Sequence, residues 1–217
     1  MYNKVTPDVI EALTAAVGRE YVLYDEETLH LYSEDETEDL NFPPEVVVKP
    51  ATAEEVSRIF KIANEYKIPV TPRGGGTGLS GGALAVHGGI CLSMARFNKI
   101  LEIDEKNFQA IVQPGVITQV FQEEVEKLGL FYPPDPASRG SCHLGGNLAE
   151  CSGGPRAVKY GVTKDYVLGL EAVLPTGEII DTGGRVLKNV TGYNLTQLIV
   201  GSEGTLAVIT KINFRLI

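Results

Sequence analysis

This chain is constrained most by one glycine-rich run, Thr71-Pro72-Arg73-Gly74-Gly75-Gly76-Thr77-Gly78-Leu79-Ser80-Gly81-Gly82. Six of the twelve residues are glycine, and the run follows the short strand-like segment Ile68-Pro69-Val70. Glycine loses much conformational entropy on folding, so this density needs a physical reason. A backbone that turns tightly and brings its N–H groups close to an anion supplies one, and a diphosphate is a common anion of this kind.

The run also matches GxGxxG, the pattern of the dinucleotide-binding Rossmann fold, through Gly76, Gly78 and Gly81. That fold needs a helix that opens within the glycines, and four glycines between residues 81 and 89 make a helix unfavourable there. No acidic residue ends a second strand about 20 positions on, and no Gly-Lys-Ser/Thr follows as in a Walker loop. The run predicts a free-standing anion-binding loop between two strands, with a plain structural turn as the alternative.

Length and composition describe an ordinary globular protein of one large or two small domains, with 217 residues, 43% hydrophobic and 22% charged. Cys91, Cys142 and Cys151 form no CxxC pair, so we expect small buried thiols rather than a metal site. Reduced thiols favour an intracellular protein. We find neither a leader peptide nor an apolar run of membrane-spanning length, and expect a cytoplasmic protein or one peripheral to a membrane.

The net charge of −9 is concentrated at the start of the chain. Residues 1–40 hold eleven acidic residues against Lys4 and Arg19, whereas the remaining 177 residues hold 17 of each sign. We interpret the acidic lead segment as a solvated face rather than a docking surface. Since no basic patch is present, nucleic acid is not an expected partner.

Hydrophobic periodicity predicts a mixed α and β chain. Residues 7–17 are expected to form a helix that Gly18 ends, and residues 53–66 an amphipathic helix that Thr52 and Glu55 cap. The segment up to Pro44 is expected to be polar and weakly patterned. Further helices are predicted at 118–128 and near 193–199, and strands at 45–49, 68–71, 89–93, 100–104, 108–112, 166–174, 178–181 and 206–215.

Two later stretches are expected to be functional loops. Residues 133–154 carry Pro134-Asp135-Pro136-Ala137-Ser138, Gly145-Gly146-Asn147 and Ser152-Gly153-Gly154 without core-forming periodicity, and long ordered loops in compact domains are often functional. A third glycine cluster, Gly201-Ser202-Glu203-Gly204-Thr205, precedes the strand that begins at Leu206. Three such loops could wrap an extended ligand with polar and flat parts.

Five motifs occur in order: PRGGGTGLSGG, PPDPAS, GGNLAECSGG, KYGVTKDYVLGLEAVLPTGE and TGYNLTQLIVGSEGTLAVIT. Over about residues 40–217 the chain resembles FAD-linked oxidases, and more narrowly the FAD subunit of glycolate oxidase and the D-lactate and D-2-hydroxyacid dehydrogenases. The resemblance implies an α+β, PCMH-type FAD-binding fold of the vanillyl-alcohol oxidase type. Two α+β subdomains, about 41–105 and 106–217, would follow the lead segment 1–40, with FAD between them and the cap domain absent.

The resemblance also implies cofactor-binding residues in both subdomains. The loop that wraps the FAD pyrophosphate is expected to be Pro72, Arg73, Gly74, Gly75, Gly76, Thr77, Gly78 and Leu79. Residues beside the ribityl chain and isoalloxazine are expected to be Pro134, Asp135, Ala137, Ser138, Ser141, Cys142, Gly145, Gly146 and Asn147. Further contacts are expected from Glu150, Cys151, Ser152, Gly153, Gly161, Glu203, Gly204 and Ile209.

Two further features of these segments concern covalent attachment of FAD and catalysis. The glycine loop holds no histidine for a covalent bond, and the hydroxyacid branch that the chain resembles binds FAD without one, so we favour non-covalent FAD although Cys151 lies in the later loop. His143 stands beside the expected ring as a candidate base, but an ordinary packing role is favoured. No catalytic residue and no metal ligand is assigned. Asn194 stands where relatives often carry aspartate.

The resemblance implies oxidation of a D-2-hydroxy acid such as glycolate or D-lactate to the 2-oxo acid by hydride transfer to flavin N5. Its substrate site would lie in a cap domain outside this chain, so the chain alone is expected to be inactive. A non-catalytic FAD-carrying or scaffold subunit of a larger oxidase is the alternative, and a mononucleotide-binding module without flavin is a third. Other oxidase subunits, an electron acceptor and a homodimer are the partners considered.

Overall fold

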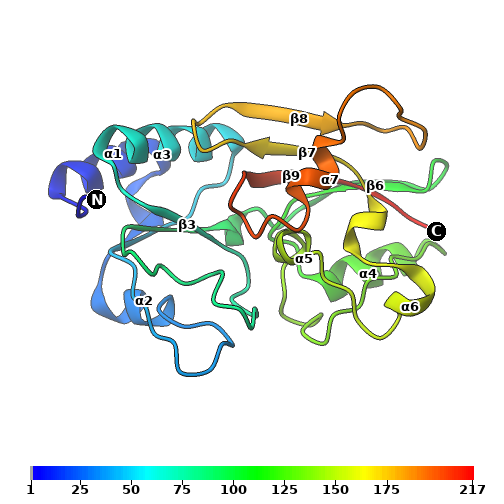
Figure 1. Cartoon of the computed structure of the whole chain (residues 1–217), viewed down its shortest axis with the longest axis horizontal. Coiled ribbons are helices and arrows are strands. Elements are labelled where there is room, and N and C mark those ends of the chain that lie inside the picture. The colour runs from blue at the N-terminus through cyan, green and yellow to red at the C-terminus, as the bar shows by residue number, and fades with distance from the viewer. Residues whose placement is uncertain (1) are drawn as a thin grey trace. The chain divides into compact units, whose positions relative to one another are not determined.

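The computed structural model describes residues 2–217 and divides the chain into two compact units, each considered by itself (Figure 1). Unit 1 runs up to Arg96 and includes Val173–Ile179, and unit 2 comprises Phe97–Ala172 and Ile180–Ile217. The division after Arg96 lies before the boundary near residue 105 that the sequence suggested, and the lead segment 1–40 falls within unit 1. Equating these units with two FAD-binding subdomains stays a prediction.

Unit 1 is built on a four-stranded sheet in the order β1-β2-β4-β3. Its strands are β1 (Val22–Leu23), β2 (Val46–Val48), β3 (Val70–Arg73) and β4 (Ile90–Ser93). β4 pairs in parallel with both β2 and β3, whereas β1 is antiparallel to β2. The predicted crossover between parallel strands is confirmed, with β4 inserted between the two strands that the crossover connects.

Two amphipathic helices of unit 1 agree with the sequence analysis. α1 (Pro7–Val17) ends at Gly18, whose φ of 93° is accessible to glycine, and α3 (Ala53–Tyr66) follows Thr52. Only half of the predicted capping box forms: the Thr52 hydroxyl accepts from Glu55 N at 3.2 Å, but the Glu55 carboxylate accepts from Ala51 N at 2.7 Å. The two helices pack together, and α3 buries Val56 and Ile59 completely.

The lead segment contains more structure than its polarity indicated. A 3₁₀ turn (η1, Arg19–Tyr21), strand β1 and helix α2 (Glu26–Leu31) lie within residues 19–31. α2 is capped by Asp25, whose carboxylate accepts from Thr28 N at 2.9 Å and whose pKa is lowered by this bond. None of the residues of α2 is buried, so hydrophobic periodicity gave no signal for it.

Unit 2 is built on a five-stranded sheet in the order β5-β6-β9-β7-β8. Its strands are β5 (Ile100–Asp104), β6 (Gln109–Val112), β7 (Val167–Val173), β8 (Ile179–Gly183) and β9 (Val208–Arg215). β6 is antiparallel to β5 and to β9, and all residues of β9 except Lys211 and Arg215 are buried. Phe214 of β9 stacks with Phe121 and makes a tilted ring contact with Tyr132, at ring centroid distances of 5.4 and 4.7 Å, and these rings form the centre of this core.

The helices of unit 2 are α4 (Thr118–Glu126), α5 (Leu144–Glu150), α6 (Ala157–Tyr160) and α7 (Leu195–Ile199), together with the 3₁₀ turn η3 (Thr163–Tyr166). A further 3₁₀ turn, η2 (Met94–Arg96), ends the first segment of unit 1. α4 and α7 confirm predicted helices. The prediction that residues 133–154 are loop throughout is wrong, because α5 occupies 144–150. Its buried Leu144 and Leu148 supply one helical face, which the flanking glycines had obscured.

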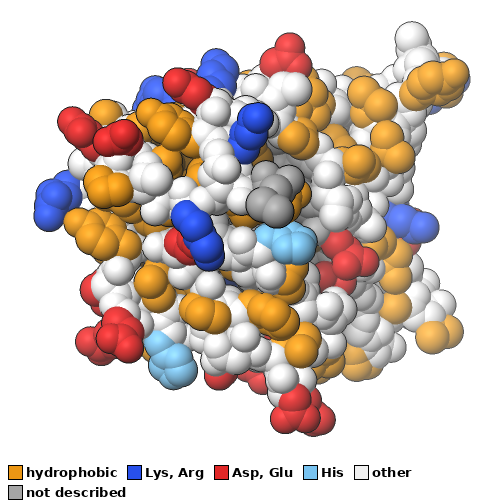
Figure 2. Space-filling model, turned by 60° about the vertical axis from the view of Figure 1, so that its left-hand side comes forward, with side chains coloured by type: hydrophobic (Ala, Val, Ile, Leu, Met, Phe, Trp, Pro, Cys, Tyr) orange, Lys and Arg blue, Asp and Glu red, His pale blue; other side chains and the backbone are white. Residues whose placement is uncertain are grey.

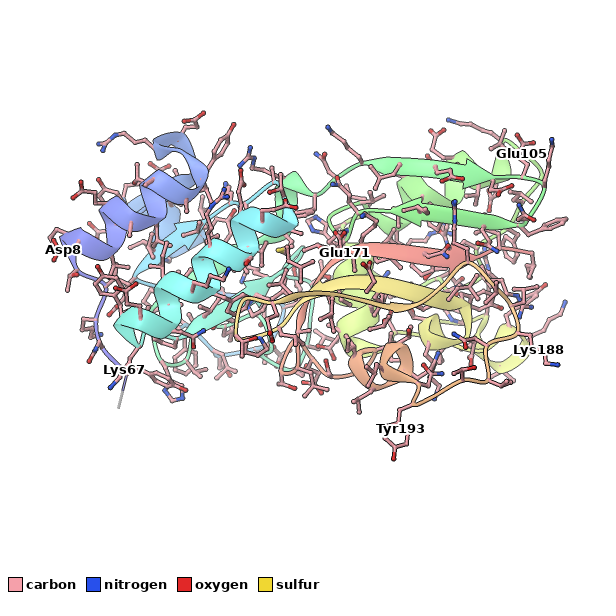
Figure 3. All side chains as sticks on the ribbon, turned by 90° about the horizontal axis from the view of Figure 1, so that it is seen from above. Asp8, Lys67, Glu105, Glu171, Lys188 and Tyr193 are labelled. Atoms are coloured by element: carbon pink, nitrogen blue, oxygen red, sulfur yellow. The ribbon has the colours of Figure 1, made fainter. Side chains whose placement is uncertain are left out.

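The long connection from Gly184 to Asn194 lies at the surface of unit 2. Lys188 and Tyr193 project outward from it in Figure 3, and the Tyr193 side chain is 96% exposed. At its end Asn194 caps α7 by accepting a hydrogen bond from Gln197 N at 3.0 Å. Asparagine therefore supplies the N-cap acceptor that an aspartate at this position would also supply.

Candidate cofactor site

The glycine loop, defined as residues 74–82, leaves β3 of unit 1 and leads towards β4 without any helix between the two strands. This confirms that its GxGxxG pattern does not open a Rossmann helix. Gly76 and Gly81 adopt φ values of 69° and 73°, a left-handed conformation that glycine reaches without strain. The backbone path thus explains why glycine is needed at these two positions.

The backbone N–H groups of the glycine loop are left without acceptors. Within residues 2–217, none of the N–H groups of residues 75–80 donates a hydrogen bond, and the next one, that of Gly81, donates to the Thr37 hydroxyl at 2.8 Å. A folded chain pairs nearly all of its backbone donors unless water or a ligand takes them. Six consecutive free donors are the arrangement that an anion-binding loop requires.

Space at the loop also suits a close backbone approach. No atom lies within 4 Å of the point where a side chain would begin at Gly78, and Leu79 is 78% exposed. At Gly76 the same point collides with the Arg73 guanidinium, so one side of the loop is packed. The free amides, the open side and the absence of a carboxylate among residues 71–90 fit a diphosphate.

The predicted unit 2 residues lie along α5 and its flanking segments. Pro134, Asp135, Ala137, Ser138, Ser141 and Cys142 precede α5; Gly145, Gly146, Asn147 and Glu150 belong to it; Cys151, Ser152 and Gly153 follow it. Gly161 ends α6 with a φ of 85°, Glu203 and Gly204 lie in the turn before β9, and Ile209 lies within β9. Pro134, Cys142, Asn147 and Ile209 are buried, whereas Ala137, Ser141 and Glu150 are exposed.

Asp135 is engaged by the protein itself. Its carboxylate pairs with the Arg156 guanidinium at 3.1 Å and accepts from Arg156 N at 3.3 Å, while Asp135 N donates to Gly153 O at 3.2 Å. A side chain at Gly154, where φ is 121°, would collide with the Asp135 carbonyl. The segments before and after α5 are therefore clamped together, and the clamp accounts for Asp135 and Gly154 without a ligand.

The third glycine cluster meets the end of α5. Glu203 N donates to Ala149 O at 3.0 Å and Gly201 N to Leu148 O at 2.9 Å, and a side chain at Gly201 would begin 3.5 Å from Cys151. Cys151 has the left-handed φ of 50° that ends the helix, and Glu203 a φ of 53°. The structure thus brings together the second and third predicted contact segments within unit 2.

Buried polar side chains support α5 from within. Asn147 Nδ2 donates to the Thr118 hydroxyl, and that hydroxyl lies 3.2 Å from Cys142 Sγ. Cys142 and Asn147 are thereby engaged in the interior of unit 2, and a direct cofactor contact from either would need them to change partners.

The three cysteines differ in burial. Cys142 and Cys91 are buried thiols, as expected from the sequence, and Cys151 is only half-buried. Burial raises the pKa of the Cys91 thiol to about 12, against the opposing charges of Arg73 and Lys49.

His143 precedes α5, and its Nδ1 is buried without a hydrogen-bond partner among the described residues. Burial lowers the pKa of this imidazole below its ordinary value, so the neutral ring is favoured near neutral pH. Its backbone pairs with Ile117 in an isolated antiparallel bridge. These contacts fit the packing role favoured from the sequence.

Several partners of the site could not be found from sequence. Tyr32, Glu34 and Thr37 of the lead segment contact Arg73 or the glycine loop, and Arg156 holds Asp135. The hydrogen-bonded pairs among them, Glu34–Arg73, Thr37–Gly81 and Asp135–Arg156, are 21 to 44 residues apart in the sequence. No periodic or motif signal links them, so only the fold reveals them.

A surface hollow in unit 1 does not suit the cofactor. It is lined by Tyr24, Glu26, Glu27, Leu29, His30, Ser33, Asn41 and Pro43, so its charged lining is acidic. Figure 2 shows acidic, basic and hydrophobic side chains interspersed on the face turned forward, without an extended basic area. Within residues 2–217, no cluster of His, Cys, Asp and Glu is suited to a metal, and no helix is long and apolar enough to cross a membrane.

Comparison with known proteins decides the family. Residues 44–183 match the model of the FAD binding domain family, a range that contains the glycine loop and α5. This chain belongs to that family. The predicted resemblance is therefore confirmed, and FAD is the cofactor of the domain.

The relatives extend this result. The chain is 48% identical to the "Glycolate oxidase subunit GlcD" of Bacillus subtilis (strain 168), over 98% of this chain and 45% of the relative. It is 44% identical to the "D-lactate dehydrogenase" of Anaerostipes hadrus, over 100% of this chain and 45% of that protein. The chain thus spans less than half the length of these curated relatives.

A solved structure confirms the predicted α+β, PCMH-type fold. The chain superposes on p-cresol methylhydroxylase with bound substrate at a TM-score of 0.86 and 24% identity, over 100% of this chain and 45% of that one. At this identity the likeness shows the fold alone.

Proposed function

We propose that this chain is the FAD-binding part of a flavoenzyme that oxidises a D-2-hydroxy acid, of the glycolate or D-lactate type, to the 2-oxo acid. The substrate class is supported by the names of relatives that are 48% and 44% identical to the chain. When bound, FAD supplies the oxidant, which accepts a hydride from the substrate carbon at flavin N5. The chain's own part is to hold and orient the cofactor.

The observation that carries the proposal is the row of free backbone N–H groups at residues 75–80. We assign this row to the diphosphate of FAD, with Pro72, Arg73 and Gly74 as the segment that leads into it. Amide donors neutralise an anion without adding side-chain charge, which agrees with a chain that has no basic excess. The Thr77 hydroxyl is a further donor of the same loop.

Unit 2 is assigned to the rest of the cofactor through accessible residues. Ala137, Ser138, Ser141, Gly146 and Ser152 are at least partly exposed, and Gly146 has open space where a side chain would begin. Glu150, Cys151, Gly153, Gly161, Glu203 and Gly204 are assigned with them, whereas Pro134, Asp135, Cys142, Gly145, Asn147 and Ile209 shape the segment from within. The attachment is non-covalent, with Cys151 as a free thiol.

The proposal is tested in two steps. Purified protein should show a flavin absorption spectrum or acquire one with added FAD, and a colourless protein that refuses FAD would overturn the flavin assignment. A chimera of this chain with the remaining sequence of the Bacillus subtilis relative is then mixed anaerobically with glycolate, D-lactate or L-lactate. Bleaching by a D-2-hydroxy acid or glycolate supports the enzyme, whereas bound FAD that none of them reduces favours a carrier or scaffold subunit.

The partners follow from the same relatives. One is a subunit of an oxidase, so we propose that other oxidase subunits or an electron acceptor bind the complete protein. A homodimer and a cytoplasmic or membrane-peripheral location remain part of the proposal. Size-exclusion chromatography with light scattering tests the homodimer, and fractionation of cells tests the location.

A further inference from the structure

Arg73, the last residue of β3, is a buried cation at the base of the glycine loop. Its side chain is held by the lead segment: Nη2 donates to Glu34 O at 2.7 Å, and the guanidinium lies 5.3 Å from the centre of the Tyr32 ring. The residue is only 8% exposed, and Nη1 is buried without a hydrogen-bond partner among the described residues. The Nη1 group of the Arg73 guanidinium is thus left without a hydrogen bond, although the side chain is held in place.

The guanidinium also lies directly against the loop. A side chain built at Gly76 would collide with Arg73 Nη2 and would begin 2.9 Å from Cζ. Arg73 therefore occupies the side of Gly76 from which a side chain would project. Because Nη1 is shielded from solvent, this cation can influence a bound anion through the loop backbone rather than by direct contact.

No carboxylate neutralises Arg73. Within residues 2–217 it forms no ion pair, although Glu34 and Asp35 belong to the segment that contacts it. Glu34 contributes its carbonyl to Arg73 and its carboxylate to Asn41 Nδ2, and Asp35 accepts from Thr37 N. A buried charge without a counter-charge is unfavourable, so an anion that binds nearby would relieve the cost.

A strap, defined as residues Tyr32–Leu40, fixes both ends of the loop. At the start it holds Arg73 through Tyr32 and Glu34, and at the end the Thr37 hydroxyl accepts from Gly81 N at 2.8 Å. Leu40 Cδ1 lies 3.4 Å from the point where a Gly81 side chain would begin. The strap therefore sets the position of the cation and the span of the free amides together.

We propose that Arg73 is the fixed counter-charge of the cofactor diphosphate, held behind the glycine loop by the strap, and acts as a positioning residue without touching the ligand. This rests on the proposed assignment of the loop to FAD. It adds a formal charge to a site that otherwise offers amide dipoles, and it gives the acidic lead segment a role in cofactor binding.

The test compares FAD with riboflavin, which lacks the diphosphate, by fluorescence titration of apoprotein. Arg73→Met should weaken FAD binding by about tenfold or more while changing riboflavin binding less than about twofold, because a partly desolvated charge pair is lost only with FAD. Arg73→Lys should recover part of the affinity, and Tyr32→Leu should cost less than Arg73→Met. The slope of log affinity for FAD against log salt should become shallower in Arg73→Met.

Arg96→Met is the matched control. Arg96 belongs to the same unit, stacks 3.3 Å from the centre of the Tyr21 ring and donates to Lys49 O at 2.7 Å, but Glu55 neutralises it at 3.8 Å. Its replacement should leave the ratio of FAD to riboflavin affinity unchanged. Circular dichroism checks that each variant folds, and Arg73→Gln, which also removes the charge, keeps the test available if Arg73→Met does not fold.

The outcomes separate the inference from the assignment of the loop. Equal losses of FAD and riboflavin affinity, or an unchanged salt slope, in a folded Arg73→Met or Arg73→Gln protein would show structural support only and overturn the counter-charge. Unchanged FAD affinity would overturn it too. If the parent protein binds no FAD at all, the proposed function fails first, and the counter-charge fails with it.

Discussion

The glycine loop of unit 1 and the α5 segment of unit 2, residues 133–154, share a glycine-rich composition but differ in what their backbones do. In the glycine loop the N–H groups of residues 75–80 have no acceptor within the described chain. In the α5 segment Asp135, Cys142, Leu144, Gly145 and Ser152 all donate from their backbone nitrogens to carbonyls of the same unit. Two segments of similar composition therefore have different physical roles: one leaves its backbone donors free and the other pairs them within its own unit.

The difference teaches how to separate ligand contacts from scaffold. Glycine that leaves donors free beside open space, as at Gly78, is available to a ligand. Glycine pressed against its neighbours, as Gly145 is against Pro114 and Gly154 against Asp135, is needed for packing. We accordingly expect changes in the glycine loop to affect ligand binding and changes in the α5 segment to affect stability.

The largest effect is expected from Gly76→Val. A β-branched side chain at a φ of 69° is strained and would also collide with Arg73, so FAD affinity should fall at least ~100-fold. The measurement is flavin titration. Gly129→Ala, at a φ of 73° with open space and outside the proposed site, is the control and should bind FAD normally. Stoichiometric FAD retained by Gly76→Val would count against the loop assignment.

Asp135→Asn should act on stability. The change removes the charge paired with Arg156 in a half-buried setting, and we expect a loss of about 1–2 kcal/mol in the free energy of unfolding. Urea denaturation measures it. Glu124→Gln, which removes an exposed pair with Lys127, should change stability by less than about 0.5 kcal/mol. A folded, fully stable Asp135→Asn protein with weakened FAD binding would reverse the assignment of Asp135 to scaffold.

Thiol labelling examines the accessible part of the α5 segment. Cys151 is half-buried and should react with iodoacetamide in the native protein, whereas buried Cys91 and Cys142 should react only after unfolding. Saturating FAD should slow the labelling of Cys151 by about fivefold if its segment contacts the cofactor, as burial reduces thiol reactivity. Mass spectrometry of the labelled peptides gives the rates, and the Cys151→Ser protein supplies the background. Unchanged labelling with FAD bound would remove Cys151 from the site.

The smallest effect concerns pH. Burial depresses the pKa of His143 in the folded state below the ordinary value of 6.5, so the unfolded chain binds the proton more readily. Stability should therefore fall as pH decreases through about 6.5 towards the folded pKa. His143→Gln should flatten this part of the profile of free energy of unfolding against pH. An equally steep profile in His143→Gln would assign the dependence to other groups.

The fold was predictable where hydrophobic periodicity was strong. α1, α3 and α4 and most strand positions agree with the sequence analysis, because apolar residues such as Val56 and Ile59 recur on one helical face. α2 has no buried residue to create such a pattern, and in α5 the Gly145-Gly146 pair conceals the face formed by Leu144 and Leu148. Tertiary contacts decided these elements.

The glycine loop was predictable for the same kind of reason: its composition excluded a helix, and the structure has none. Its surroundings were not, because the strap contacts depend on a carbonyl of Glu34 and a hydroxyl of Thr37 that carry no motif. The Asp135–Arg156 pair likewise became visible only when folding brought residues 21 positions apart together. The sequence therefore predicted the loop proposed to face the ligand, but not the side chains and carbonyls that hold the loop and the α5 segment in place.

Hydrogen exchange at the glycine loop tests the central claim most directly. The amides of residues 75–80 have no acceptor in the structure, so they should exchange rapidly in apoprotein. Saturation with FAD should slow their exchange strongly, while the amides of α5, already bonded within unit 2, should change less. Unchanged exchange of residues 75–80 in protein that carries stoichiometric FAD would contradict the account.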